Sequence, residues 1–368
     1  MNRTRRHHDW LERIAEAGLS GDRQKVEVVI LSAIRSLKKS DPTLSDSLGA
    51  VYASYAVSGQ ALRSHKTPPP PADQEEGMAL VRIPNYMSSE PPILPETAQA
   101  AVALFIEERQ KAEVLLRAGY APPCSLLVTG APGTGKTMLA RWLASELELP
   151  LVVQDLATSI SSLLGKTGLN LRRTLDYARS HSCLLLLDEF DAIAKRRDDS
   201  SELGELKRIV NVLLKELEDW PHHSILMAAT NHPELLDPAI ERRFQVLLRL
   251  PLPDQAGLCE ILKIKLGGFS SEIPEFVYNA CSSVLVGASG SDVERIANSV
   301  ARRHLTRSEL FIDALVSVTS NCKTSPNSDG TKALLRALRE SNSKLTVREL
   351  GRLVGKAPST IQYHLQKD

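Results

Sequence analysis

Short apolar runs and helical patterns follow one another through the middle of the chain. Apolar runs of strand length lie at 125–129, 151–153, 183–187, 225–229 and 246–250. Glycine-rich or helical segments separate them, and this order is typical of a parallel sheet with helices on both faces. We therefore predict an α/β fold, in which helices sandwich a parallel sheet.

The pattern is helical on both sides of this core. Apolar residues recur at helical spacing over 97–118 before the sheet, and over 255–266, 274–282 and 292–304 after Pro251. The later segments predict a small helical lid. Residues 10–62 and the stretch from Lys332 onward also read as helical. The sequence does not indicate what residues 10–62 do.

Stretches rich in proline, glycine and polar residues divide the chain. One follows Lys66 and contains four consecutive prolines, and another spans 324–330. Such segments bury little surface and typically act as linkers. The predicted domains are a helical N-terminal region (1–65), a Pro-rich linker (66–96), an α/β core (97–251), a helical lid (252–305), a linker (306–330) and a C-terminal segment (331–368).

Composition narrows the possible settings of the protein. Apolar residues make up 42% of the 368 residues and the formal net charge is +1, so the chain as a whole does not indicate a nucleic-acid or membrane partner. The five cysteines stand far apart without a Cys-x-x-Cys pair, which favours reduced core thiols. With no apolar stretch of membrane-spanning length, we expect a cytoplasmic protein.

The segment Gly130-Ala-Pro-Gly-Thr-Gly-Lys-Thr137 matches the phosphate-binding loop pattern. It lies between an apolar strand and a helical run, as that motif requires. Glycines let backbone N–H groups wrap the phosphates of ATP, Lys136 reaches the outer phosphates, and the Thr137 hydroxyl faces Mg²⁺. The predicted nucleotide-binding residues of this segment are Gly130, Pro132, Gly133, Thr134, Gly135, Lys136, Thr137 and Met138.

Two acids, Asp188 and Glu189, come directly after the apolar run at 183–187. A carboxylate next to a buried strand is costly unless it has a partner, and a metal ion would provide one. We expect Asp188 to hold Mg²⁺, directly or through water, and Glu189 to orient the attacking water. The alternative is that both acids only cap the next helix.

From Asp188 to Arg197 the chain resembles the second acidic motif of the AAA family, which belongs to the P-loop ATPases. Residues 228–231 resemble the first sensor, which implies that Asn231 aligns the water. Residues 236–244 resemble the arginine-finger segment, which implies that Arg242 and Arg243 act on ATP in a neighbouring subunit. Residues 287–292 resemble the second sensor, which implies that Gly290 closes the lid on nucleotide.

The resemblance covers a little over half of the chain and has two departures. Leu163 stands where family members that thread polypeptides place an aromatic residue. Leu163 and Leu164 would therefore either grip a substrate or belong to the core or an interface. His232 stands where many members have arginine, a change that the sequence does not explain.

Residues 346–365 resemble a helix-turn-helix of the DNA-binding type. Gly355 would form the turn and Pro358 would begin the second helix. From Lys332 to Asp368 there are eight Lys or Arg residues against three Asp or Glu, as phosphate contact requires. Small trihelical segments also bind proteins or cap larger domains. Residues predicted to pack inward are Leu350, Leu353, Ile361 and Leu365, and those predicted to face a groove are Ser359, Thr360, Gln362 and Tyr363.

Three functions remain open from the sequence. In the first, the chain hydrolyses ATP in a homo-oligomeric ring, with six subunits implied by the family, and remodels a protein substrate or partner. In the second, it is an ATP-controlled switch that binds DNA through residues 331–368. In the third, it is a scaffold gated by nucleotide that turns ATP over slowly. ATP and Mg²⁺ are the expected cofactors.

Overall fold

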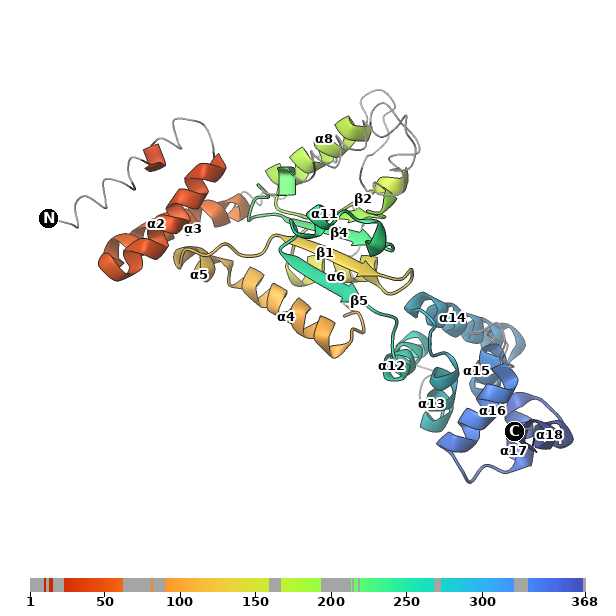
Figure 1. Cartoon of the computed structure of the whole chain (residues 1–368). Coiled ribbons are helices and arrows are strands. Elements are labelled where there is room, and N and C mark those ends of the chain that lie inside the picture. The colour runs from red at the N-terminus through yellow and green to blue at the C-terminus, as the bar shows by residue number, and fades with distance from the viewer. Residues whose placement is uncertain are drawn as a thin grey trace. The chain divides into compact units, whose positions relative to one another are not determined.

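The computed structural model describes residues 10, 13–15, 23–61, 81, 90–158, 167–192, 213, 215–217, 219–267, 273–320 and 330–366. The chain divides into two compact units (Figure 1). The sheet unit contains residues 1–91, 99–129 and 137–249, and the lid unit contains residues 92–98, 130–136 and 250–368. Of the expected linker 66–96, residues 66–80 and 82–89 lie outside the described part.

The core of the sheet unit is a five-stranded sheet. Its strands are β1 (Ser125–Gly130), β2 (Leu151–Asp155), β3 (Leu184–Asp188), β4 (Ile225–Thr230) and β5 (Val246–Leu250). They lie in the order β2-β3-β4-β1-β5, and the pairs β1–β4, β2–β3 and β3–β4 run parallel. The predicted α/β fold with a parallel sheet is confirmed, and each predicted strand agrees within two residues at either end.

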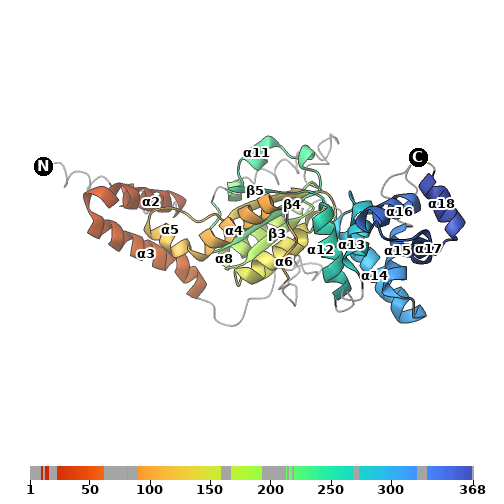
Figure 2. The same ribbon diagram turned by 90° about the horizontal axis from the view of Figure 1, so that it is seen from below.

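Helices cover both faces of this sheet. On one face lies α8 (Thr167–Ser180), whose Leu171 and Leu175 are buried together with Val152 and Leu185 of the strands. Figures 1 and 2 show α4 (Glu96–Gln110) and α6 (Lys136–Glu146) on the other face. Because both faces are covered, β3 and β4 are apolar on both sides, which explains why their sequences read as continuous apolar runs.

The helix predicted over 97–118 is two helices. After α4, the backbone at Lys111 leaves helical geometry (φ −93°, ψ 20°), and α5 (Ala112–Arg117) follows. Two N-terminal helices, α2 (Arg23–Ser40) and α3 (Pro42–Ala61), form a hairpin that packs on α5. Leu31, Ile34, Tyr52 and Ala53 share a small core there with Leu116.

The hairpin approaches α5 closely at Gly49. A Cβ on this residue would lie 2.7 Å from the carbonyl oxygen of Arg117, closer than any side chain allows. The Glu27 and His222 side chains also meet, with 3.8 Å between Oε2 and Nε2. The N-terminal helices are therefore packed against the rest of the sheet unit.

The lid unit is helical. After the sheet come α12 (Gln255–Leu266), α13 (Glu275–Val284), α14 (Gly290–Arg307) and α15 (Phe311–Ser320), followed by α16 (Gly330–Ser341), α17 (Val347–Val354) and α18 (Pro358–Gln366). Within the expected linker 306–330, α15 is a helix with a buried apolar side, which includes Phe311 and Leu315. The rest of that stretch from residue 321 to 329 lies outside the described part.

One hydrophobic core includes buried residues of every helix from α12 to α18 in the described part of the lid unit. Leu258 and Leu262 of α12 belong to it, and so do Leu334 and Leu338 of α16 and Ile361 of α18. The C-terminal helices thus share their buried surface with the lid. Among the helices of the described residues, none combines the length and apolar character needed to cross a bilayer.

Candidate functional site

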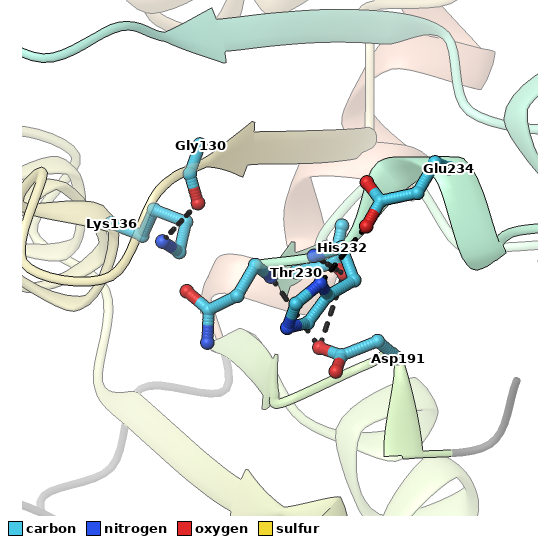
Figure 3. A network of polar contacts seen from close by, with 7 residues as sticks. Gly130, Lys136, Asp191, Thr230, His232 and Glu234 are labelled. Atoms are coloured by element: carbon cyan, nitrogen blue, oxygen red, sulfur yellow. Dashed lines mark hydrogen bonds and ion pairs between the residues drawn. The ribbon is translucent and has the colours of Figure 1, made fainter. Parts of the chain in front are cut away.

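The phosphate-binding loop forms the turn between β1 and α6. Gly133 and Gly135 have φ values of 78° and 95°, a left-handed geometry that favours glycine. Lys136 begins α6 and is buried, and its Nζ donates hydrogen bonds to the carbonyl oxygens of Gly130 (2.7 Å) and Ala131 (2.9 Å) (Figure 3). A buried ammonium at a helix N-terminus is suited to bind an anion such as a phosphate.

Gly133 also meets the start of α14, the helix that carries the predicted second sensor. Its carbonyl oxygen accepts a hydrogen bond from the Ser291 N–H at 3.2 Å. A Cβ on Gly133 would lie 2.1 Å from Ser291 Oγ and 2.6 Å from Ser289 Oγ, so only glycine fits. Gly290 approaches the same carbonyl, with 3.2 Å from an ideal Cβ to the oxygen. The loop and the predicted Gly290 turn therefore lie together within the lid unit.

Ser289 holds the first turn of α14 in a capping box with Asp292. The Ser289 hydroxyl donates to the Asp292 carboxylate (2.7 Å), and the Ser289 N–H donates to the same oxygen (3.0 Å). Both hydrogen bonds lower the pKa of Asp292, and the one from the hydroxyl has the larger effect. Ser289 and Ser291 were not predicted from the sequence, although the pattern Ser-x-x-Asp before a helix is a recognisable cap signal.

In the sheet unit, Thr137 and Asp188 lie side by side. The Thr137 Oγ1 donates a hydrogen bond to Asp188 Oδ2 at 3.0 Å. A hydroxyl and a carboxylate oxygen so close together fit Mg²⁺, which prefers oxygen ligands and usually takes few from the protein, completing its shell with water and phosphate. The two residues predicted to hold the metal are thus brought together.

Glu189 has an unusual backbone. Its φ is 53°, in the left-handed region, and its N–H donates to Asp188 Oδ1 at 3.0 Å. The side chain of Glu189 is exposed, whereas that of Asp188 is half-buried. Strained backbone of this kind costs on the order of 1 kcal/mol and gathers at functional sites. The turn directs two adjacent acids into different surroundings.

Asn231 follows β4 and belongs to a polar network that was not predicted from the sequence. Figure 3 shows Asp191, Thr230, His232 and Glu234 of this network. Asp191, which is buried, accepts hydrogen bonds at Oδ1 from Thr230 Oγ1 (3.1 Å) and from the Asn231 N–H (3.4 Å). Thr230 Oγ1 accepts in turn from the His232 N–H at 3.0 Å. Asp191 is the third acid within residues 188–191, and this cluster of acids is the sequence signal that could have identified it.

His232, which departs from the family pattern, has a partner of its own. Its Nδ1 lies 2.9 Å from the Glu234 Oε1, at the exposed end of the network. A backbone hydrogen bond lowers the pKa of Glu234, and the hydrogen bond with His232 lowers it further.

Arg242 and Arg243 follow α11 (Pro238–Glu241), and both side chains are exposed. The next residue, Phe244, is buried and packs edge-on against Phe190, with 6.1 Å between ring centroids. Phe244 therefore anchors the segment while the arginines face outward.

The structure gives fewer contacts for the remaining predicted site residues. Thr134 Oγ1 donates to the Ala131 carbonyl at 2.9 Å, which holds the loop around the exposed Pro132. Met138 is half-buried in α6. Leu163 and Leu164, and residues 193–197 of the acidic motif, lie outside the described residues.

A short turn joins the C-terminal helices α17 and α18, in the segment for which the sequence predicts a helix-turn-helix. Gly355 makes the turn with φ 65°, and Gly351 allows close approach, since its Cβ would lie 2.8 Å from the Lys356 carbonyl oxygen. Leu350 and Ile361 are buried as predicted, whereas Leu353 is only half-buried and Thr360 is not fully exposed. Exposed residues of α18 are Ser359, Gln362 and Tyr363. The side chain of Leu365 lies outside the described residues.

Comparison with known proteins finds a likeness in the middle of the chain. Residues 126–252 match the model of the ATPase family associated with various cellular activities (AAA). An uncharacterised AAA family ATPase, y4kL, of Sinorhizobium fredii is 38% identical over 198 residues, which are 54% of this chain and 59% of the relative. The 26S proteasome regulatory subunit 10B homolog A of Arabidopsis thaliana is 34% identical over 50% of this chain and 48% of its own length.

The chain spans about half the length of these curated relatives. Among solved structures, the FIGL-1 AAA domain has a TM-score of 0.53 and 21% identity, covering 75% of this chain and 90% of that domain. That likeness concerns the fold alone. The matched segment contains the loop at 130–137 and the acids after β3, so the likeness to the AAA family lies in the part of the chain that holds the predicted nucleotide site.

Proposed function

We propose that this protein hydrolyses ATP in a ring of subunits, six by family resemblance, and uses the cycle to remodel a partner protein. The observation that carries the proposal is the Thr137 hydroxyl on the Asp188 carboxylate, directly after a buried Lys136. Phosphoryl transfer depends on positioning and charge neutralisation, and these groups supply both.

Each residue has a role in the proposed reaction. When ATP binds, the Lys136 Nζ, which donates to two loop carbonyl oxygens, donates to phosphate oxygens instead. Thr137 and Asp188 would hold Mg²⁺, which when bound neutralises charge on the phosphates. Glu189, exposed beside Asp188, accepts the proton of the attacking water. Asn231 orients that water from the end of β4.

The ring is supported by the arginines. Arg242 and Arg243 are exposed, as a side chain that acts on a neighbour's ATP must be. A finger that acts in trans requires a head-to-tail interface, which closes into a ring. The partner protein is supported by the likeness to a proteasome regulatory subunit, since a proteasome acts on proteins.

The experiment is steady-state ATP hydrolysis by the full chain, alone and with an unfolded protein such as reduced, carboxymethylated casein. Stimulation by the unfolded protein is the expected result, with Glu189→Gln as the inactive control. Absence of hydrolysis at any subunit concentration would overturn the proposal. Hydrolysis that the unfolded protein leaves unchanged would remove the remodelling part.

A second candidate function is an ATP-controlled switch on DNA. The observations that favour it are the α17–α18 pair, the exposed Gln362 and Tyr363, and the excess of positive charge after Lys332. Binding of duplex DNA that weakens steeply with salt, and that is lost in Gln362→Ala/Tyr363→Ala, would support this function. Unchanged binding by that variant would count against it. Tight ATP binding with very slow turnover would instead favour a scaffold.

A further inference from the structure

We propose that Asp191 is a positioning residue, which orients Asn231 for hydrolysis through one buried carboxylate oxygen. The inference rests on the proposed hydrolysis of ATP and adds a residue that the motif comparison leaves without a role. Asp191 lies after β3 and is only 4% exposed.

Hydrogen bonds link Asp191 to the three residues at and after the end of β4. Its Oδ1 accepts from the side chain of Thr230 and from the backbone of Asn231, and the His232 N–H reaches it through Thr230 Oγ1. Thr230 is fully buried, so its hydroxyl proton is committed to the carboxylate. One oxygen atom thus determines the backbone direction from which the Asn231 side chain leaves the strand.

The backbone on the other side of the network is also held. The Phe190 N–H donates to the Ala229 carbonyl oxygen at 2.9 Å, which keeps the chain after β3 beside the end of β4. A buried carboxylate is costly, and an apolar residue would fill the same space at lower cost. A carboxylate at this point is explained by the need to hold the half-buried turn after β4 to a single geometry. Loss of the Asp191 carboxylate should therefore lower the rate of ATP turnover more than it lowers the stability of the fold.

The first test compares Asp191→Ala with wild type in the full chain, under conditions where the ring is assembled. We expect kcat to fall at least ~10-fold, because displacement of an aligned group by a fraction of an ångström slows reactions strongly. The dissociation constant for ADP should stay unchanged. Asp191→Asn, which keeps an acceptor oxygen, should recover part of the loss. An unchanged kcat would overturn the proposal, and so would an equal weakening of nucleotide binding.

Thr230 gives a second route that does not remove the buried carboxylate. Thr230→Val deletes the hydroxyl with nearly constant shape and should lower kcat, whereas Thr230→Ser keeps the hydroxyl and should restore it. Glu234→Gln is the matched control at the exposed end of the network, and it should leave kcat unchanged. If Thr230→Val and Thr230→Ser had equal kcat, the Thr230 hydroxyl would not contribute and the proposed role of Asp191 through it would be wrong.

A double-mutant cycle isolates the route through Asn231. If Asp191 acts only by orienting Asn231, adding Asp191→Ala to Asn231→Ala should cause no further loss of kcat. Fully additive losses would overturn the proposal, since Asp191 would then act independently. If wild type does not hydrolyse ATP, the proposed function fails first; if wild type hydrolyses ATP and Asp191→Ala does so equally well, only this inference fails.

Discussion

At the scale of single residues, the two acids after β3 have separate surroundings. Asp188 receives the Thr137 hydroxyl, while Glu189 projects from a left-handed turn. We expect Glu189→Gln to bind ATP normally and to hydrolyse it 10²- to 10⁴-fold more slowly, the usual range for loss of a general base. Measurement of kcat together with ATP affinity checks this. Turnover at the wild-type rate would show that another group activates the water.

Lys136 should behave differently from Glu189. Its buried ammonium is held at the loop carbonyls, where the motif predicts that the phosphates bind. We expect Lys136→Ala to weaken ATP binding itself, measured by titration of a fluorescent ATP analogue. Equal affinity in wild type and Lys136→Ala would mean that the lysine contacts no phosphate.

The cysteines give a pH-dependent prediction. Burial raises the pKa of Cys124 to about 11 and those of Cys183 and Cys281 to about 12. The neutral thiols therefore stabilise the native state fully below the ordinary value of 9.0, and this contribution is lost as pH rises toward 11 to 12. We expect these three thiols to resist a thiol reagent at pH 8 until the protein is unfolded, as counted by mass spectrometry. Rapid labelling of any of them in the native protein would contradict their burial.

At the scale of elements, the start of α14 depends on its cap. Ser289→Ala removes the hydroxyl that the first turn uses, and we expect a loss of about 1 kcal/mol in the free energy of unfolding of the lid unit. Chemical denaturation of the full chain measures it. Ser283→Ala in α13, whose hydroxyl bonds only within its own helix, is the control. A loss no larger than that of the control would show that the capping box contributes little.

The elements also show how far the sequence could lead. The strands, the loop and the acids were predictable because each depends on a local pattern that sterics and phosphate chemistry demand. The break at Lys111 and the helix α15 were not, since tertiary contacts decide both. Asp191 was missed for the same reason: its partners on β4 follow it by about 40 residues, and only the parallel register of β3 and β4 brings them together.

At the scale of the whole molecule, the arginines and the acids should complement one another between subunits. Arg243→Ala and Glu189→Gln should each be inactive alone. Mixed rings should regain part of the activity, because an Arg243→Ala subunit keeps its Glu189 and receives an arginine from its Glu189→Gln neighbour. ATP hydrolysis measured across mixing ratios checks this. If every mixture stays inactive although the subunits co-assemble, Arg243 does not act in trans.

The core shared by α12 to α18 also has a consequence for how the chain is made. The sheet unit has all its strands once residue 250 has been synthesised, but the lid unit cannot close its core until α16 and α18 exist. At typical rates of translation, the roughly one hundred residues in between take on the order of 5 to 20 s. During that interval the nascent chain has these five strands but an incomplete lid core, so the lid unit reaches its full stability only after α18 has been made.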